Sequence, residues 1–234
     1  FTYKKYDEWE FLVPKNIKGF VKKYHDNIFS DKYDIYNVTI NDKTDKKIMQ
    51  FLTDVVIIIK KSGIKYWLEG GTCLGAIRDG KLIPWDHDLD VGIEYTNKES
   101  IDSLIKNLKK KYYLKIREFP NLNGVWNLGP YRLIKIYQRK NIIFHEELCL
   151  DIFIFYKQKL NNKTSKMVYK YVVFNKNGYH PSKYLDIVKS IDFYGSKFNV
   201  PNNVEEWLQT KYGRDWETPK KSWHVLIDDG TLIR

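Results

Sequence analysis

The sequence predicts an α+β fold in which a mixed β-sheet is flanked by helices. Apolar residues recur at helical spacing over residues 45–59, and an apolar strand, Ile64–Leu68, follows and runs into a double glycine. Two later apolar runs, Leu89–Ile93 and Leu148–Tyr156, carry acids and have the branched and aromatic residues typical of strands. With 234 residues, 43% of them hydrophobic, the chain is long enough for one well-buried domain.

The pattern divides the chain into three parts. Residues 46–219 are expected to form the main domain, residues 1–45 an N-terminal extension that packs on it, and residues 220–234 a C-terminal tail. The extension holds three predicted elements: a strand or edge segment at Glu8–Pro14, a short helix at Ile17–Tyr24 and a strand at Tyr36–Ile40.

Elements of the main domain follow from periodicity and from turn residues. The first helix ends at Ser62-Gly63, and Asn97–Lys111 is amphipathic, with lysines opposite its apolar face. Pro120–Pro130, rich in Asn and Gly, is a loop. The other predictions are strands at Tyr112–Phe119, Tyr131–Gln138, Asn141–His145 and Leu148–Tyr156, a strand or helix at Met167–Phe174, a hairpin at Phe193–Pro201, and a helix at Asn202–Gly213 with an Asn cap and a terminal Gly.

The double glycine, Gly70-Gly71, marks a candidate anion site. Peptide N–H groups at a strand-to-helix turn lack an internal partner, so they can bind phosphate oxygens. Glycine lets the backbone approach the anion and adopt a positive φ. A Gly-Gly pair alone is more often an ordinary turn, so this interpretation depends on what lies beside it.

The run Asp86-His87-Asp88-Leu89-Asp90 supplies that neighbour. Residues two apart on a strand point the same way, so Asp86, Asp88 and Asp90 are expected to line one face. Crowded carboxylates repel one another unless a cation lies among them, and their hard oxygen atoms suit Mg²⁺ or Mn²⁺. Because the surrounding residues are apolar, a solvated loop is the weaker explanation. A phosphate-binding turn beside a carboxylate metal site is typical of enzymes that transfer phosphoryl or nucleotidyl groups.

The motif Gly70-Gly71-Thr72-x-Leu74-Gly75-Ala76-x-Arg78, followed by Ile83-Pro84-Trp85-Asp86-x-Asp88-x-Asp90-Val91-Gly92, resembles the LicD/fukutin family of the nucleotidyltransferase-fold superfamily. The segment Arg214–Pro219 resembles the C-terminal signature of the same family. Members transfer phosphocholine from CDP-choline, or polyol phosphates such as ribitol phosphate from CDP-ribitol, onto glycans. The resemblance therefore implies a nucleotidyltransferase-like core, a CDP-activated donor and a glycan acceptor.

The resemblance also implies roles for the acids. Asp88 and Asp90 are the expected metal ligands, and Asp151 matches the third carboxylate that the superfamily carries in an apolar strand. A buried acid satisfied by backbone donors is the alternative for Asp151. Either Asp151 or Asp86 takes the proton from the acceptor hydroxyl; Asp86 is equally well explained as a support for the ligands or as a turn cap.

Phosphate contacts are expected from the glycine turn and from three cations. Gly70, Gly71 and Thr72 are expected to hold the diphosphate of the donor. Arg78 is the nearest cation for the phosphate charge, with a salt bridge to Asp79 or to the acid cluster as the alternative. Arg132 and Lys135 are further candidates, with solvent exposure as the alternative.

Composition sets the remaining expectations. The net charge of +11 favours an anionic partner, but no basic stripe interleaved with aromatics indicates nucleic acid. Cys73 and Cys149 give no disulfide framework or zinc spacing and are expected in the core. No apolar run approaches the ~18 residues of a membrane span, so at most peripheral membrane contact is expected. The chain begins at Phe1 rather than Met; its expected location is cytoplasmic or membrane-peripheral, or a secretory lumen if an N-terminal anchor precedes it. The oligomeric state is not readable.

The leading functional hypothesis is a Mg²⁺-dependent transferase that moves a phospho-alcohol from a CDP-activated donor to a sugar hydroxyl and releases CMP. One alternative is a nucleotidyltransferase that uses an NTP on a sugar phosphate, RNA or protein. The other is a non-catalytic nucleotide- or glycan-binding module, which the intact set Asp88, Asp90 and Asp151 disfavours.

Overall fold

The computed structural model describes residues 2–6, 9–13, 42–141, 144–161 and 163–233, which fall into two compact units, Phe1–Asn37 and Val38–Arg234. In the first unit, β1 (Thr2–Tyr6) pairs with β2 (Trp9–Val13) in antiparallel fashion, and β2 corresponds to the strand predicted at Glu8–Pro14. The helix predicted at Ile17–Tyr24 and the strand predicted at Tyr36–Ile40 lie outside the described residues. The packing of residues 1–45 on the core stays a prediction.

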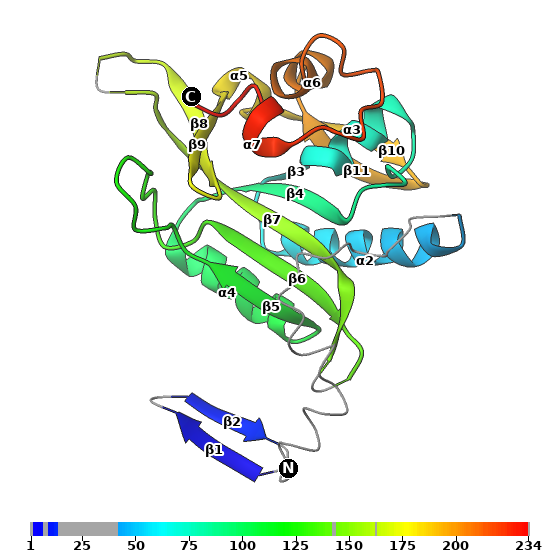
Figure 1. Ribbon diagram of the computed structural model, residues 1–234, viewed down its shortest axis with the longest axis vertical. Helices are drawn as coiled ribbons and strands as arrows, with labels where there is room; N and C mark the ends of the chain where they lie inside the picture. The colour runs from blue at the N-terminus through cyan, green and yellow to red at the C-terminus, as the bar shows by residue number, and fades with distance from the viewer. Residues whose placement is uncertain (1, 7–8, 14–41, 142–143, 162, 234) are drawn as a thin grey trace. The chain divides into compact units, whose positions relative to one another are not determined.

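The second unit is built on a seven-stranded sheet (Figure 1). Its strands are β3 (Tyr66–Leu68), β4 (Asp88–Glu94), β5 (Tyr112–Arg117), β6 (Leu133–Arg139), β7 (His145–Lys159), β8 (Met167–Val173) and β9 (Lys176–Pro181). The order is β3-β4-β7-β6-β5, and β8 and β9 continue from the far part of β7. The strands β4 and β7 run parallel and the other neighbours antiparallel, so the mixed sheet and the α+β class predicted from the sequence are confirmed.

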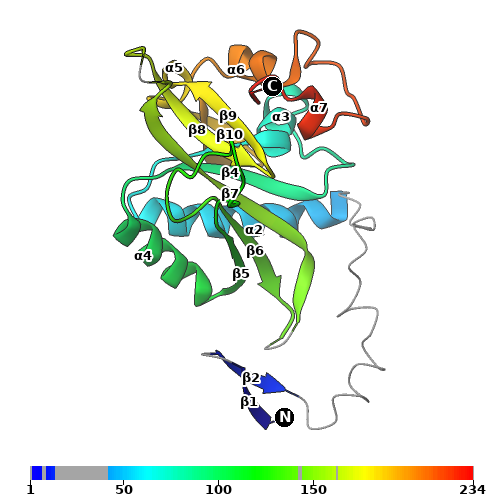
Figure 2. The same ribbon diagram turned by 60° about the vertical axis from the view of Figure 1, so that its left-hand side comes forward.

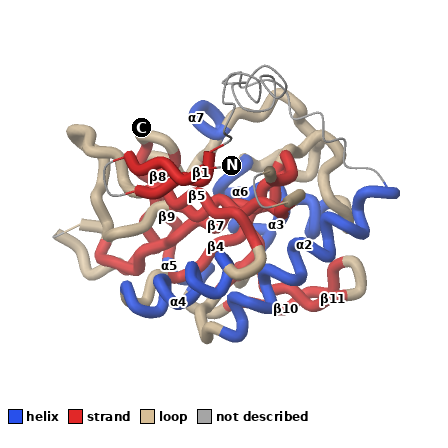
Figure 3. The backbone as a smooth tube through the Cα atoms, turned by 90° about the horizontal axis from the view of Figure 1, so that it is seen from below, coloured by secondary structure: helices blue, strands red, loops and turns tan. Residues whose placement is uncertain are grey.

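Two helices, α2 (Asp42–Lys61) and α4 (Lys98–Lys109), lie side by side along one face of this sheet (Figure 3). The α4 helix begins as predicted, because the Asn97 side chain accepts a hydrogen bond of 2.8 Å from the Ser100 amide. Strand residues that face the helices, such as Leu89 and Ile152, are completely buried. Because side chains alternate along a strand, their neighbours face the other side of the sheet.

That other side is covered over part of its area by aromatic packing. The helices α5 (Ser182–Leu185) and α6 (Val204–Tyr212) lie at the same end of the molecule as β8 and β9 (Figure 2). The rings of Trp67, Phe155 and Tyr169 pack together there. Gly92 leaves room for them, because a Cβ on it would lie 2.4 Å from the Trp67 ring. The remaining part of this face carries the polar side chains described below.

Three smaller elements complete the unit. The helix α3 (Gly70–Arg78) joins β3 to the loop before β4, and it starts at the first glycine rather than after the pair. A hairpin of β10 (Val188–Phe193) and β11 (Ser196–Pro201) confirms the turn predicted in that region. A short helix, α7 (Val225–Asp228), precedes the C-terminal residues. None of the described helices is both long enough and apolar enough to span a lipid bilayer.

Two predictions of local structure were wrong. The strands expected at Asn141–His145 and Leu148–Tyr156 are one continuous strand from His145, because Glu146 and Glu147 lie where the strand is partly exposed and do not interrupt it. The capping hydrogen bond of the last long helix is also absent: Asn203 is the N-cap residue, but its backbone is left-handed (φ 49°) and its side chain makes no capping hydrogen bond. The helix ends as expected at Gly213, whose φ is +93°.

Candidate active site

Neighbouring strands bring the predicted acids together on one face of the sheet. Asp90 of β4 lies opposite Asp151 of β7, and Lys135 of β6 lies opposite Asp151 on its other side. One step toward the start of β4, Asp88 lies opposite Cys149. Because these positions are separated by two residues along each strand, their side chains share a face. The sequence prediction that Asp151 joins Asp88 and Asp90 is consistent with this register.

Asp90 is held by the turn that contains the two glycines. Its backbone carbonyl accepts a hydrogen bond of 3.1 Å from the Glu69 amide, and its backbone amide donates one of 2.8 Å to Thr72 Oγ1. Its carboxylate oxygen Oδ2 accepts a third, of 3.1 Å, from the Gly71 amide. The first turn of α3, which the sequence predicts as a phosphate cradle, thus uses the Gly71 amide and the Thr72 hydroxyl to fix a carboxylate of the chain itself.

The two glycines are required because carboxylates occupy the space of their missing side chains. A Cβ on Gly70 would lie 2.4 Å from Asp90 Oδ2, and a Cβ on Gly71 would lie 1.9 Å from Asp86 Oδ2. Gly70 also has a φ of +51°, a conformation that other residues rarely adopt. The glycine turn and the acids therefore form one packed unit.

Asp86 reaches this unit from a loop. It precedes β4, so the expectation that Asp86, Asp88 and Asp90 line one face of a single strand holds only for the last two. Its amide donates to the Ile83 carbonyl at 3.0 Å, and its Oδ1 accepts from the His87 amide at 3.0 Å. This turn directs the carboxylate toward Gly71, and burial raises the pKa of Asp86.

Lys135 is the cation that pairs with the acids in the described part of the chain. Its Nζ lies 2.6 Å and 2.8 Å from the two oxygens of Asp151 and 3.7 Å from Cys149 Sγ. Burial opposes its charge, but Asp151 more than offsets that effect and raises the pKa of Lys135. Burial raises the pKa of Asp151 despite this partner, because the carboxylate is almost completely enclosed.

The cluster carries more negative charge than one lysine neutralises. Burial, followed by the charges of Asp86 and Asp151, raises the pKa of Asp88 to about 7. Burial, followed by the charges of Asp88, Asp86 and Asp151, raises the pKa of Asp90 well above its usual range. Buried like charges of this kind are stabilised by a bound cation, so the arrangement fits a divalent metal ion.

The donor atoms also fit a metal ion. Asp88, Cys149 and Asp151 each offer a ligand atom, and these atoms lie within 4.8 Å of one another. Burial and the Asp151 charge raise the pKa of the Cys149 thiol, so the thiol is protonated at neutral pH. Carboxylate oxygens are then the available donors, and hard oxygen donors suit Mg²⁺ or Mn²⁺.

The two predicted arginines do not join the acids in ion pairs. Arg78, at the far end of α3, forms hydrogen bonds of 2.8 Å and 2.6 Å with the carboxylate of Asp79, the alternative weighed from the sequence. Arg132 donates to the carbonyls of Glu118 and Val172 at 3.2 Å and 3.4 Å. Its charge still favours the ionised form of Asp151, so it contributes to the field of the site without contacting it.

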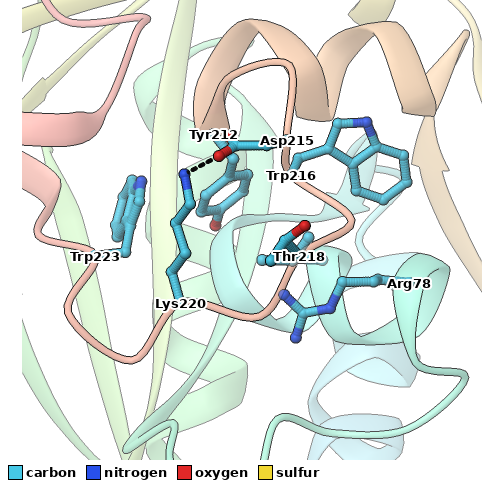
Figure 4. A pocket seen from close by; sticks show the side chains of 8 residues that line it. Arg78, Tyr212, Asp215, Trp216, Thr218, Lys220 and Trp223 are labelled. Carbon is cyan, nitrogen blue, oxygen red and sulfur yellow. Dashed lines mark ion pairs between the residues drawn. The ribbon is translucent and has the colours of Figure 1, made fainter.

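A small pocket lies beside α3 on the side of Arg78 (Figure 4). It is lined by Leu74, Arg78, Tyr212, Asp215, Trp216, Thr218, Lys220 and Trp223. An ion pair of 2.5 Å between Lys220 and Asp215 crosses it, and the rings of Tyr212 and Trp223 lie 4.8 Å apart. Burial raises the pKa of the Tyr212 phenol, and the charges of Asp90 and Asp86 act in the same direction, whereas the charge of Lys211 opposes them.

Sequence reasoning missed three residues around the acids. The sequence predicts Cys149 in the core, which its burial confirms, but the residue also contacts Lys135. Its spacing of two from Asp151 on one strand is the signal that indicates this. Glu69, next to the first glycine, is buried, and its carboxylate accepts a hydrogen bond from the Trp67 indole. Tyr212 comes from a helix that is distant in sequence, so no local pattern could have placed it.

Comparison with known proteins identifies the family. The family model described as LicD/FKTN/FKRP, nucleotidyltransferase domain, matches residues 63–203. The human ribitol 5-phosphate transferase FKRP is 28% identical over 162 residues, which cover 68% of this chain and 30% of that protein. The human ribitol-5-phosphate transferase FKTN is 26% identical over 235 residues, which cover 93% of this chain and 46% of that protein.

Among solved structures, the antibiotic-resistance factor ANT(2'')-Ia aligns over 77% of this chain and 78% of that one, with a TM-score of 0.42 and 14% identity. The chain spans less than half the length of the curated relatives it matches, from 30% to 46%. The family model covers the glycine turn, β4 and the whole of β7, which carry the site. The resemblance read from the sequence is therefore confirmed, and the chain belongs to the LicD/FKTN/FKRP family of nucleotidyltransferase domains.

Proposed function

We propose that this chain is the catalytic domain of a metal-dependent transferase. It moves a phospho-alcohol, phosphocholine or a polyol phosphate, from a CDP-activated donor to a hydroxyl of a glycan and releases CMP. Family membership supports the general reaction, since two relatives are named ribitol-5-phosphate transferases. The observation that carries the proposal is the convergence of Asp86, Asp88, Asp90 and Asp151 beside Lys135.

Asp88, Asp90 and Asp151 would hold Mg²⁺ or Mn²⁺. A divalent ion there would neutralise charge on the donor phosphates and polarise the reacting oxygens. The glycine turn of Gly70, Gly71 and Thr72 would form the wall that faces the diphosphate. Among the cations, Lys135 is the best placed for a phosphate contact, because it already lies at the carboxylates. Arg132 would act through its field and Arg78 at greater distance.

We further propose Asp86 rather than Asp151 as the group that accepts the proton of the acceptor hydroxyl. Both oxygens of Asp151 are engaged by Lys135, at 2.8 Å and 2.6 Å. Asp86 lies on a loop at the edge of the cluster, and burial raises its pKa, which makes its carboxylate a stronger proton acceptor. Of the two proton acceptors that the sequence leaves open, Asp86 is therefore the one that we propose.

A ligand screen by thermal shift tests the proposal. The chain is heated with Mg²⁺ and, in separate samples, CDP, CDP-choline, CDP-ribitol, CTP, ATP and UTP, and the double variant Asp88→Ala/Asp90→Ala serves as control. We expect stabilisation by a cytidine diphosphate compound that requires Mg²⁺ and disappears in the double variant. The donor that stabilises most is then incubated with Mg²⁺ and candidate glycans, and release of CMP is measured.

Two other outcomes of the screen would contradict the proposal and favour a different function. Stabilisation by triphosphates with no response to CDP compounds would indicate nucleotidyl transfer from an NTP. Equal stabilisation of wild type and double variant by a nucleotide would indicate a binding module that does not use the acids.

A further inference from the structure

Two groups of buried polar side chains meet at the glycine turn. Their members, in the described part of the chain, are completely or almost completely buried. Thr72, Asp90 and Asp151 belong to the acid cluster. The second group consists of Glu69, His180, Lys211, Asp229 and Thr231. Glu69 and Gly70 are adjacent in sequence, so the second group ends where the first begins.

Lys211 is at the centre of the second group. Its ammonium donates a hydrogen bond of 2.9 Å to Asp229 Oδ2 and lies 3.5 Å from Glu69 Oε1. The other oxygen of Glu69 accepts from the Trp67 indole at 2.8 Å. Asp229 is in turn held by the amide of Thr231, at 2.9 Å. Lys211 comes from α6 and Asp229 from the segment after α7, so residues near the C-terminus reach under the turn between β3 and α3.

Glu69 connects this group to the acids through the backbone. Its amide donates to the Asp90 carbonyl at 3.1 Å, while Gly71 and Thr72, two and three residues later, hold the Asp90 carboxylate and amide. A shift of Glu69 would therefore move all three contacts that fix Asp90.

A buried ion pair is costly to desolvate and adds little net stability over apolar packing, so retaining one at this point favours a role in fixing geometry. We infer that Lys211 is a positioning residue for the acid cluster: its ammonium holds Glu69, and Glu69 holds the glycine turn and Asp90 in place. Lys211 and Asp229 lie outside the span matched by the family model, residues 63–203. The C-terminal segment is then part of the site. The cation-binding half of this inference rests on the proposed function.

The test compares Lys211→Met with Leu208→Ala on the same helix. Leu208 is also completely buried but has an apolar side chain, so its variant controls for loss of packing in α6. Hydrogen–deuterium exchange is measured for the amides of residues 69–73 and of Asp90, at a temperature well below both unfolding midpoints. Binding of Mn²⁺ alone is measured by electron paramagnetic resonance on the same proteins. Glu69→Gln is a second variant, in which the turn keeps a hydrogen-bonding side chain of the same size.

We expect faster exchange at residues 69–73 in Lys211→Met than in Leu208→Ala, and Mn²⁺ affinity about tenfold lower or more, the usual cost of removing a group that orients a metal ligand. Glu69→Gln should fall between wild type and Lys211→Met. Equal exchange at these residues in the Lys and Leu variants would overturn the positioning role. Faster exchange with unchanged Mn²⁺ affinity would overturn the link to cation binding. If wild type binds no Mn²⁺, the proposed function fails, and the exchange data still decide whether Lys211 holds the turn. Should Lys211→Met not fold, the comparison of Glu69→Gln with Leu208→Ala decides in the same way.

Discussion

Gly71 and Asp86 are in direct contact, and the contact leaves no space for a side chain on the glycine. A Cβ at Gly71 would lie 1.9 Å from Asp86 Oδ2 and 3.0 Å from its carboxyl carbon. Asp86 would have to leave the cluster to admit even one methyl group. The φ of Gly71 is not positive, so the backbone itself accepts alanine, and the contact with Asp86 is what excludes it.

Gly71→Ala should therefore fold and lose activity. We expect a decrease in kcat of about a hundredfold or more, because displacement by ~1 Å of a group at the reacting atoms costs about that much. Gly80→Ala is the matched control. Gly80 has a φ of +62°, and no atom beyond its two chain neighbours lies within 4 Å of the place that a Cβ would take, so alanine there costs backbone strain of about 1 kcal/mol without displacing another part of the protein. Transferase assays and thermal unfolding of both variants check this. Equal activity losses in the two variants would mean that the Asp86 contact is unimportant.

Asp88→Asn should raise the stability of the metal-free protein while removing its response to metal. Asp88 is enclosed beside Asp86 and Asp151, and these like charges oppose one another. An uncharged isostere relieves that repulsion, so we expect about 1–2 kcal/mol more stability without metal. Saturating Mg²⁺ or Mn²⁺ should then stabilise wild type far more than the variant.

The measurement is urea unfolding with and without Mg²⁺. Asp192→Asn is the control, because Asp192 lies in the β10–β11 hairpin with an exposed side chain. A metal-free Asp88→Asn protein that is less stable than wild type would show that the carboxylate is stabilised by its surroundings and does not await a cation.

Part of this site could be predicted from the sequence and part could not. The glycine turn, Asp88, Asp90 and Asp151 are local signals: a Gly-Gly pair after a strand, and acids within apolar runs of period two. Which side chains pair with these acids depends on which strands become neighbours in the sheet. The pairing of Lys135 with Asp151 needs the register of β6 on β7, and no pattern in either strand contains it. For the same reason the amide of Gly71 was expected to face a phosphate, whereas in the structure it binds Asp90.

The fold follows the same division. Helices with a long apolar stripe, such as α2 and α4, are close to their predicted bounds, because one face of each is buried on the sheet. The sequence predicts two strands where the structure has β7, because Glu146 and Glu147 interrupt the apolar pattern. The strand continues past them although its pairing with β6 is irregular there, where the register shifts between Tyr137 opposite Cys149 and Arg139 opposite His145. The side-chain cap predicted for α6 is wrong: Asn203, at the N-cap position, has a left-handed backbone, and its side chain makes no hydrogen bond to the helix.

Asp86→Asn and Asp151→Asn should separate proton transfer from metal binding. If Asp86 accepts the proton of the acceptor hydroxyl, its amide variant loses about 10²–10⁴ in kcat, the usual contribution of a general base, and retains Mn²⁺ affinity within a few fold. Asp151→Asn should lose both, and it should also be less stable, because the charge of Lys135 is left buried without its partner. Steady-state kinetics and Mn²⁺ binding on both variants provide the comparison. Loss of Mn²⁺ binding in Asp86→Asn would assign Asp86 to the metal instead.

His180 should make the protein lose stability as the pH falls. Its ring is completely buried against Tyr171 and Trp207, and burial lowers its pKa from 6.5 to about 3. Between these two values the unfolded chain binds a proton that the folded protein does not. Stability from this residue is therefore complete above the unfolded pKa and decreases by about 1.4 kcal/mol for each pH unit below it, until the folded pKa is reached.

The carboxylates also titrate in this range, so the residue is isolated by difference. His180→Phe keeps a flat ring in contact with Tyr171 and removes the titration. Urea unfolding of both proteins is measured at several pH values between about 7 and 4, and wild type should lose more stability than His180→Phe by about 1.4 kcal/mol per unit below the unfolded pKa. Parallel curves would mean that the ring is protonated, or reached by water, in the folded protein. In that case the interior between β9 and α6, where Lys211 approaches Glu69, would be wetter than its complete burial indicates.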